Sequence, residues 1–386
     1  MTQSSEPLAL YVHWPFCLSR CPYCDFNAHV RDVIPQQRFR RALRRELAWE
    51  AERLGRRPLG SIFFGGGTPS LMEPETVALL LEDARTLFEF QDDIEITLEA
   101  NPTSIEMSRL AALRAAGVNR ISIGIQSLEP EALAMLGRRH SVAQAVAALE
   151  IARTVFPRVS FDLIYARPGQ SVPAWRTELR RALDLVAGHL SLYQLTIEPG
   201  TNFEAQYRRG EIVLPDEDLA AALYDATAEE AARFGLLQYE ISNYAKPGAE
   251  SRHNLQYWRY GDYAGIGPGA HGRLTLDNHL FATRRHRAPE PWADRVERTG
   301  NGMTEQAALG PEETVREMLL MGLRLMEGIS AERLLARTGR TLSSAIDASA
   351  LRRATEEGYV TWHDGRLTAT QEGRRRLDAL LPYLVI

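Results

Sequence analysis

The stretch YVHWPFCLSRCPYCDFN, residues 11–27, contains all three cysteines of this 386-residue chain: Cys17, Cys21 and Cys24. Cysteine thiolates are the usual ligands of iron-sulfur clusters, and a four-iron cluster held by three cysteines keeps one iron without a protein ligand. Three residues separate the first two cysteines and two separate the second pair, so one short loop carries all the sulfur atoms. The stretch therefore predicts a 4Fe-4S cluster whose open iron can hold a small molecule.

The alternatives for these cysteines are a zinc site, a disulfide or unrelated buried thiols. Zinc sites usually combine four nitrogen or sulfur ligands in paired spacings, and this loop has no second pair. His13 and His29 flank the loop and keep a zinc site with three cysteines and one histidine open. An odd number of cysteines argues against a disulfide framework. The cluster is the favoured interpretation.

Short apolar runs alternate with helix-length segments through the first 235 residues. The expected strands cover residues 8–14, 61–64, 94–98, 120–125, 159–165 and 190–197. Residues 36–54 place apolar side chains on one helical face, Pro74 begins the next helix and Ser104 is expected to cap the third. Strand then helix, repeated six times, predicts an α/β fold: a partial (β/α)6 TIM-like barrel, or an open doubly wound sheet as the alternative.

Polar groups and glycines stand where the expected strands end. Parallel barrels carry their chemistry at the carboxyl ends of the strands, and glycines there let the backbone approach a ligand closely. Gly66, Gly67, Thr68, Glu99 and Gln126 stand at such ends, Asp162 lies within the fifth expected strand, and Tyr193, Gln194 and Glu198 mark the sixth. We expect them to surround one site with the cysteine loop.

The pattern changes after residue 235. Residues 237–244 are strand-like, and residues 251–272, rich in glycine and aromatic residues, are expected to form a long functional loop. Helices near residues 312–325, 331–337 and 345–358, with a hairpin that turns at Asp364 and Gly365, predict a mostly helical, winged-helix-like domain. The expected domains are a barrel over residues 1–235, an extension over 236–310 and a C-terminal domain over 311–386.

Composition limits the compartment and the partners. A formal net charge of -5 gives no broad surface for a polyanion, so nucleic acid is not an expected partner. No segment has the roughly 18 to 20 continuous apolar residues of a membrane span. The first 14 residues lack the basic and apolar regions of a signal peptide. These features predict a cytoplasmic, reducing compartment.

The cysteine spacing after a strand, followed by GGGTP at residues 65–69, resembles the radical S-adenosylmethionine (SAM) superfamily, in which SAM chelates the open iron. The motifs ITLEANP, ISIGIQSL, LGRRHS, FDLIYARPGQ, HNLQYW and GIGPGAHG extend the resemblance to the coproporphyrinogen dehydrogenase family over nearly the whole chain. By matching motifs, the resemblance implies SAM contacts from Tyr11, Gly66 and Glu99. A second SAM of the dehydrogenase branch maps to Tyr23, Gly67, Thr68, Gln126, Arg138 and Asp162.

Two features separate the branches of that family. Phe26 stands where the dehydrogenase has a fourth cysteine, and HNLQYW at residues 253–258 resembles the motif of the haem-chaperone branch, which implies that His253 ligates haem. A neutral imidazole suits an axial position, and Tyr257 and Trp258 offer rings that stack on a porphyrin. Taken without the family, a single histidine is more often a hydrogen-bonded structural residue.

The sequence thus favours a haem chaperone that binds a 4Fe-4S cluster, SAM and haem, and delivers haem to respiratory cytochromes or other apo-proteins. The alternatives are an oxygen-independent coproporphyrinogen III dehydrogenase, which decarboxylates propionate side chains oxidatively, and a radical enzyme with an unknown substrate. Whether the chain is an enzyme stays open. Transient membrane association and a homodimer also stay open, and the sequence does not identify the electron donor.

Overall fold

The computed structural model describes residues 6–384, with the side chain of Ile105 excepted. Six strands pair in parallel, in chain order: β1 (Leu8–Trp14), β4 (Pro58–Gly66), β5 (Glu89–Ala100), β6 (Arg120–Gln126), β7 (Arg158–Tyr165) and β8 (His189–Gln194). A doubly wound sheet reverses its strand order at a switch point, and this order has no reversal. The partial barrel is confirmed.

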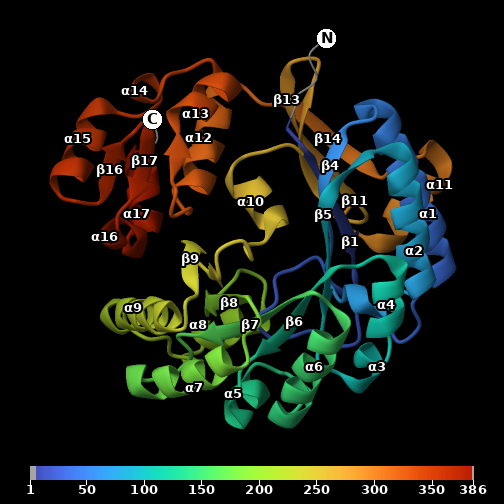
Figure 1. Cartoon of the computed structure of the whole chain (residues 1–386), viewed down its shortest axis with the longest axis horizontal. Helices are drawn as coiled ribbons and strands as arrows, with labels where there is room; N and C mark the ends of the chain where they lie inside the picture. Colours follow the sequence, from blue (N-terminus) through green and yellow to red (C-terminus); the bar gives the residue numbers. More distant parts are fainter. Residues whose placement is uncertain (1–5, 385–386) are drawn as a thin grey trace.

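Helices cover the outer face of the curved sheet (Figure 1). They are α1 (Gln36–Leu54), α2 (Pro74–Leu87), α4 (Leu110–Ala116), α6 (Val142–Val155), α7 (Val172–Asp184) and α9 (Glu217–Arg233). Shorter elements follow the carboxyl ends of the strands: η1 (Pro69–Leu71), α3 (Ser104–Met107), α5 (Pro130–Met135) and α8 (Asn202–Arg208). The cap of α3 is Thr103, not Ser104, because the Thr103 hydroxyl accepts the backbone N–H of Glu106 at 3.4 Å.

The sheet continues beyond the six strands on both edges to a total of 12. One edge adds β11 (Tyr263–Ile266), β12 (His271–Leu276), β13 (His279–Arg285) and β14 (Met303–Ala308), and the other adds β10 (Asn243–Ala245) and β9 (Leu237–Glu240). Helix α11 (Pro289–Thr299) packs on α1. The cysteine loop is bounded by a small parallel pair, β2 (Phe16–Cys17) and β3 (His29–Val30).

The prediction of a long loop at residues 251–272 is wrong. This segment forms α10 (Arg252–Trp258), β11 and the start of β12. Its glycines allow neighbouring backbone segments to pack closely. A Cβ on Gly265 would lie 2.0 Å from the carbonyl oxygen of His271, and a Cβ on Gly267 would lie 2.3 Å from the carbonyl oxygen of His13. Tight strand packing, and not loop freedom, therefore explains the glycine content.

A second, smaller unit follows at the C-terminal end. It contains α12 (Pro311–Gly322), β15 (Ile329–Ser330), α13 (Ala331–Thr338), α14 (Leu342–Ala345), α15 (Ala348–Glu356), β16 (Val360–His363), β17 (Arg366–Ala369), α16 (Gln371–Arg375) and α17 (Leu377–Leu384). Three short strands flanked by helices match the expected winged-helix-like module. The hairpin turns at Asp364 and Gly365, both with positive φ, as predicted. The domain boundaries themselves stay predictions.

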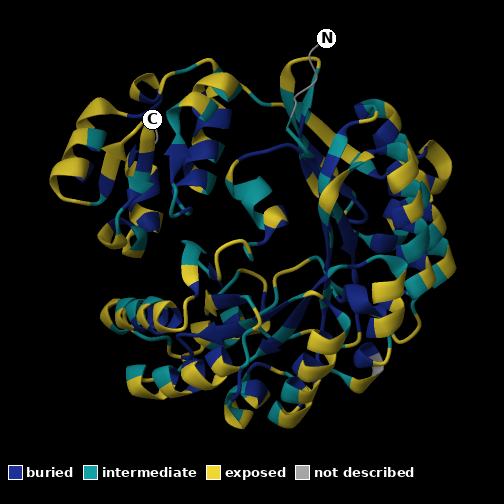
Figure 2. Ribbon diagram, viewed as in Figure 1, coloured by how far each residue is buried: buried dark blue, intermediate teal, exposed yellow. Residues whose placement is uncertain are grey.

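Two large apolar cores hold these units, and a third, much smaller cluster contains Leu136, Ile164, Leu195, Phe203 and Ile212. The largest core lies between the parallel sheet and its outer helices, and the second lies within the C-terminal unit (Figure 2). Ion pairs join the units, including Arg333 with Glu6 at 2.6 Å and Arg337 with Asp262 at 2.8 Å. Within residues 6–384, no helix has the length and apolar character needed to cross a bilayer.

Candidate cofactor site

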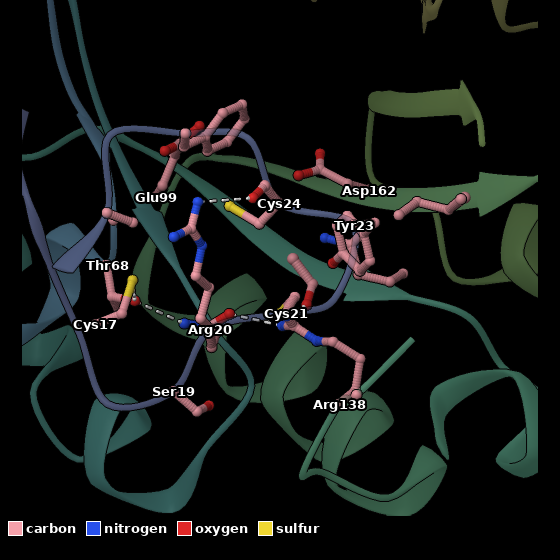
Figure 3. A pocket seen from close by; sticks show the side chains of 18 of the residues that line it. Cys17, Ser19, Arg20, Cys21, Tyr23, Cys24, Thr68, Glu99, Arg138 and Asp162 are labelled. Atoms are coloured by element: carbon pink, nitrogen blue, oxygen red, sulfur yellow. Dashed lines mark hydrogen bonds between the residues drawn. The ribbon is translucent and has the colours of Figure 1, made fainter. Parts of the chain in front are cut away.

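The carboxyl ends of the parallel strands and the cysteine loop enclose a cavity of about 520 Å³ (Figure 3). The predicted site residues that line it are Cys17, Cys21, Tyr23, Cys24, Gly66, Gly67, Thr68, Glu99, Gln126, Arg138 and Asp162. Tyr11 lies elsewhere, on the wall of a second cavity, and His253 lines neither cavity. The fold therefore brings the predicted cofactor-binding residues together in one cavity, except for Tyr11 and His253.

A chain of hydrogen bonds connects two of the cysteines across the cavity. The Arg138 guanidinium donates to Cys21 Sγ at 3.4 Å and to Asn101 Oδ1 at 2.6 Å. Asn101 Nδ2 donates to Thr68 Oγ1 at 3.3 Å, and that hydroxyl donates to Cys17 Sγ at 3.4 Å. The bond from Thr68 lowers the pKa of Cys17, although burial raises it more, and the bonds to both sulfurs fix where Cys17 and Cys21 point.

Two glycines at the end of β4 keep the backbone close to the loop. Gly66 has φ of 114°, and a Cβ there would lie 2.8 Å from the carbonyl oxygen of Trp14. A Cβ on Gly67 would lie 2.7 Å from the carbonyl oxygen of Phe16 and 3.0 Å from Cys17 Sγ. A larger residue at position 67 would therefore displace Cys17, and one at position 66 would collide with His13 and the backbone of Trp14.

The donor set fits a cluster better than a single metal ion. No group of three or more histidine, cysteine or acidic side chains among the described residues lies close enough to hold one metal ion, so the zinc alternative loses support. The three thiols nevertheless line one cavity, as the ligands of a group several atoms wide would. Burial raises the pKa of Cys17 to about 11, so binding of iron would release its proton.

Two half-buried carboxyls, Glu99 and Asp162, face the same cavity. Burial and the nearby Asp162 raise the pKa of Glu99 to about 8, although the Glu99 carboxylate accepts the backbone N–H of Gly66. Burial also raises the pKa of Asp162 to about 6, against hydrogen bonds from Ser191 and Ser122. A nearby cation would stabilise the charged form of such partly desolvated carboxyls, and the amine and sulfonium of SAM are cations.

Glu99→Gln is expected to stabilise the cluster-free protein at alkaline pH. The folded state binds a proton at Glu99 between about pH 4.5 and 8 that the unfolded state releases, so stability falls as pH rises through this window. The substitution removes this loss in the free energy of unfolding. The loss is about 2 to 4 kcal/mol at pH 9, because one pKa unit corresponds to about 1.4 kcal/mol.

Thermal melting at pH 5 and pH 9 measures this effect. The melting temperature of Glu99→Gln should exceed that of the parent chain at pH 9 and equal it at pH 5. Glu89→Gln, an exposed position on the same strand, is the matched control and should change neither value. Equal melting temperatures for Glu99→Gln and the parent chain at pH 9 would contradict the account.

His253 occupies a closed aromatic environment on α10. Ser61 Oγ lies 2.9 Å from its Nδ1, the Tyr257 hydroxyl lies 3.2 Å from its Nε2, and the Phe63 ring stacks on it at 4.9 Å between centroids. Burial and Arg120 lower the pKa of His253 to about 3, so the ring is neutral. Both ring nitrogens are engaged, and ligation of haem would require one of these bonds to break. The geometry favours the structural reading of this histidine.

Several residues that shape the site were not singled out for it by the sequence. Asn101 bridges two hydrogen bonds, and Glu106 accepts the backbone N–H of Asn101 at 2.6 Å and a bond from Ser70. Gln126, which the sequence did single out, has φ of 72° at the end of β6, a conformation rare outside glycine that tends to occur at functional sites. The motif ITLEANP was the only signal for Asn101.

Comparison with known proteins agrees with this geometry. Residues 11–180 match the family model of the radical SAM superfamily, and residues 309–376 match the HemN C-terminal domain. The heme chaperone HemW of Escherichia coli is 37% identical, over 97% of this chain and 97% of its own. The chain belongs to the HemW family of radical SAM proteins.

Other relatives of this family extend the match. The HemW of Haemophilus influenzae is 36% identical over 97% of both chains. The mitochondrial radical S-adenosyl methionine domain-containing protein 1 of Bos taurus is 42% identical over 99% of this chain and 88% of its own. Among solved structures, the coproporphyrinogen III oxidase HemN of E. coli superposes with a TM-score of 0.80 at 24% identity, over 98% of this chain and 89% of that one, which shows a shared fold.

Proposed function

We propose that this protein is a haem chaperone that carries a 4Fe-4S cluster and SAM and passes haem to apo-proteins. The observation that carries the proposal is near full-length identity of 36 to 37% to relatives named heme chaperone HemW. Cys17, Cys21 and Cys24 would hold the cluster, and Gly66 and Glu99 would contact SAM. When bound, the cluster supplies electron transfer to SAM.

The other polar residues of the cavity have supporting roles in this proposal. Arg138 and Thr68 orient two of the cysteine sulfurs through the hydrogen bonds described above. Tyr23, Gly67, Gln126 and Asp162 line the remaining wall and would contact the adenosine part of SAM, or a second SAM if one binds. Tyr11 is less suited to a SAM contact, because its hydroxyl lies 3.0 Å from Nδ1 of His13, outside this cavity.

The competing function is oxygen-independent coproporphyrinogen III decarboxylation. The structural likeness to HemN supports a common fold and no more, since the identity is 24%. Phe26 of the cysteine loop occupies the position at which the dehydrogenase branch carries a fourth cysteine, and the residue is 59% exposed. The names of the relatives favour the chaperone.

Haem-accepting apo-proteins are the partners that the proposal requires. Respiratory cytochromes are the proposed recipients, while the electron donor, a homodimer and transient membrane association remain predictions. So does the cytoplasmic compartment expected from the sequence.

An anaerobic product assay separates the two functions. Cluster-loaded protein with SAM, a reductant and coproporphyrinogen III is expected to form no protoporphyrin above background, with a known dehydrogenase as the positive control. The same preparation should bind haem, seen as a Soret band that co-elutes with the protein. Protoporphyrin formation at a rate comparable to the control would refute the chaperone proposal.

A further inference from the structure

A second cavity, of about 920 Å³, lies on the inner face of the sheet beneath the cysteine loop. The strands β1, β4 and β11 with helix α10 supply one wall, and the ends of β12 and β13 supply the opposite side. Gly66, Glu99 and Phe26 line both this cavity and the cofactor cavity. The two cavities therefore adjoin, and a ligand in the second would lie next to the cluster and SAM.

One wall of the second cavity is aromatic. Tyr11 and Phe63 stack at 6.2 Å between ring centroids, and Tyr257 and Tyr263 lie 4.2 Å apart. All four rings line the cavity, and exposed Phe26 adds a fifth from the cysteine loop. Flat aromatic walls of this kind suit a large planar ligand, because rings stack on it through dispersion and quadrupole contacts.

The opposite rim is cationic. Arg284 and Arg287 are exposed beside the cavity, and the ion pair between Arg284 and Glu305 is long at 3.6 Å. Arg285 between them is buried, ion-paired with Glu46 and Glu50, and so holds this end of β13 in place. Guanidinium groups pair with carboxylates in a bidentate manner, so the rim suits a ligand with carboxylate arms.

Three histidines line the cavity, and they differ in how many of their ring nitrogens have a hydrogen-bond partner. His13 has both ring nitrogens engaged, by Tyr11 at 3.0 Å and by the carbonyl oxygen of Asn27 at 3.0 Å. His286 Nδ1 accepts the backbone N–H of Ala288 at 3.2 Å, which leaves Nε2. The ring of His271, an exposed residue, has no hydrogen-bond partner among the described residues. Partial desolvation and Arg284, Arg273 and Arg287 lower its pKa, which keeps the imidazole neutral.

We propose that haem, the cargo in the proposed function, binds in this second cavity, with His271 as the axial ligand, Phe26 against the porphyrin face, and Arg284 and Arg287 on the propionates. This inference rests on the proposed chaperone function. It gives Phe26 a role: the ring replaces a cysteine with an apolar surface between cluster and cargo. In this proposal the haem ligand is not part of the HNLQYW motif. Tyr257 of that motif lines the cavity, and His253 contacts the Tyr257 hydroxyl from outside the cavity.

Haemin titration of the full-length chain tests the site. His271→Ala is expected to weaken haemin binding about 10-fold or more and to change the Soret and low-spin electron paramagnetic signals, because loss of even an outer-sphere partner costs about 10-fold in metal affinity. His279→Ala, an exposed histidine of the same hairpin outside the cavity, is the matched control and should match the parent chain. Addition of imidazole should restore the low-spin signal of His271→Ala.

Each outcome has a separate meaning. Failure of the parent chain to bind haemin would remove the proposed function and the site together. Parent-like binding and spectra in His271→Ala, with the parent chain binding haemin, would overturn only the site. The site would also be overturned if His253→Ala lost the axial signal and His271→Ala kept it.

The propionate contacts have their own test. Haemin dimethyl ester, which lacks free carboxylates, is expected to bind the parent chain several-fold more weakly than haemin. Arg284→Ala with Arg287→Ala should remove that preference and leave the affinity for the ester unchanged. A preference for haemin that survives in the double variant would place the propionates elsewhere and refute this orientation.

Discussion

Cys21→Ser is expected to abolish the iron-sulfur cluster while the barrel remains folded. Cys21 is a half-buried residue of a surface loop whose sulfur contacts Arg138 and belongs to neither apolar core, so its loss costs little packing. A serine hydroxyl is a much weaker iron ligand than a thiolate, and two cysteines cannot hold the cluster alone. Iron and sulfide analysis after anaerobic reconstitution, with far-ultraviolet circular dichroism, measures both parts.

Ser19→Ala is the matched control, because it changes the same loop and keeps all three sulfurs. It should retain the parent iron content. Four irons per chain in Cys21→Ser would show that the loop is not the cluster ligand set. A collapsed circular dichroism spectrum would show instead that the loop stabilises the barrel, which its contacts do not indicate.

Glu95→Ala is expected to destabilise the protein by about 3 to 5 kcal/mol, the range for a buried charge that loses its partner. Glu95 is fully buried on β5 and lies 2.8 Å from Arg158 Nη1. Its carboxylate also accepts the Ser251 hydroxyl at 3.3 Å and the backbone N–H of His253 at 3.1 Å, at the start of α10. Alanine leaves these donors unsatisfied and weakens the attachment of α10 to the sheet, although the contacts of His253 with Ser61 and Phe63 would remain.

Urea unfolding followed by circular dichroism measures this loss. Glu95→Gln keeps a carbonyl acceptor and should lose less than the alanine variant. Glu211→Ala, which removes an exposed ion pair with Arg209, should unfold at the same urea midpoint as the parent chain. A Glu95→Ala midpoint equal to that of the parent chain would refute the role assigned to this carboxylate.

The barrel was predictable because its strands and helices have distinct periods. The six apolar runs match β1 and β4 to β8, and residues 36–54 match α1 to the residue. The antiparallel strands β12 to β14 were not foreseen, because each has few buried residues and ordinary composition. Pairing between β11 and β1 joins segments about 250 residues apart in the chain, and no local pattern encodes that contact.

The candidate site was predictable where strand ends or the cysteine spacing marked it. Glu99, Gln126 and Asp162 lie in the carboxyl-terminal halves of the successive strands β5, β6 and β7, so their convergence is a consequence of the barrel. His253 shows the limit of a motif: its neighbours Ser61 and Phe63 come from β4, and only the fold reveals that they enclose the ring. His271 stands in a glycine-rich run that looked like a loop, and its free imidazole depends on the placement of β12.

Haem transfer to an apo-cytochrome is the measurement that tests the chaperone function most directly. Haem-loaded, cluster-loaded protein with SAM would be mixed anaerobically with an excess of apo-cytochrome, and the growth of the holo-cytochrome Soret band would be followed. The account predicts transfer that is faster than haem loss to a passive haem scavenger and that slows in Cys21→Ser. Transfer at the scavenger rate, unchanged by loss of the cluster, would contradict it.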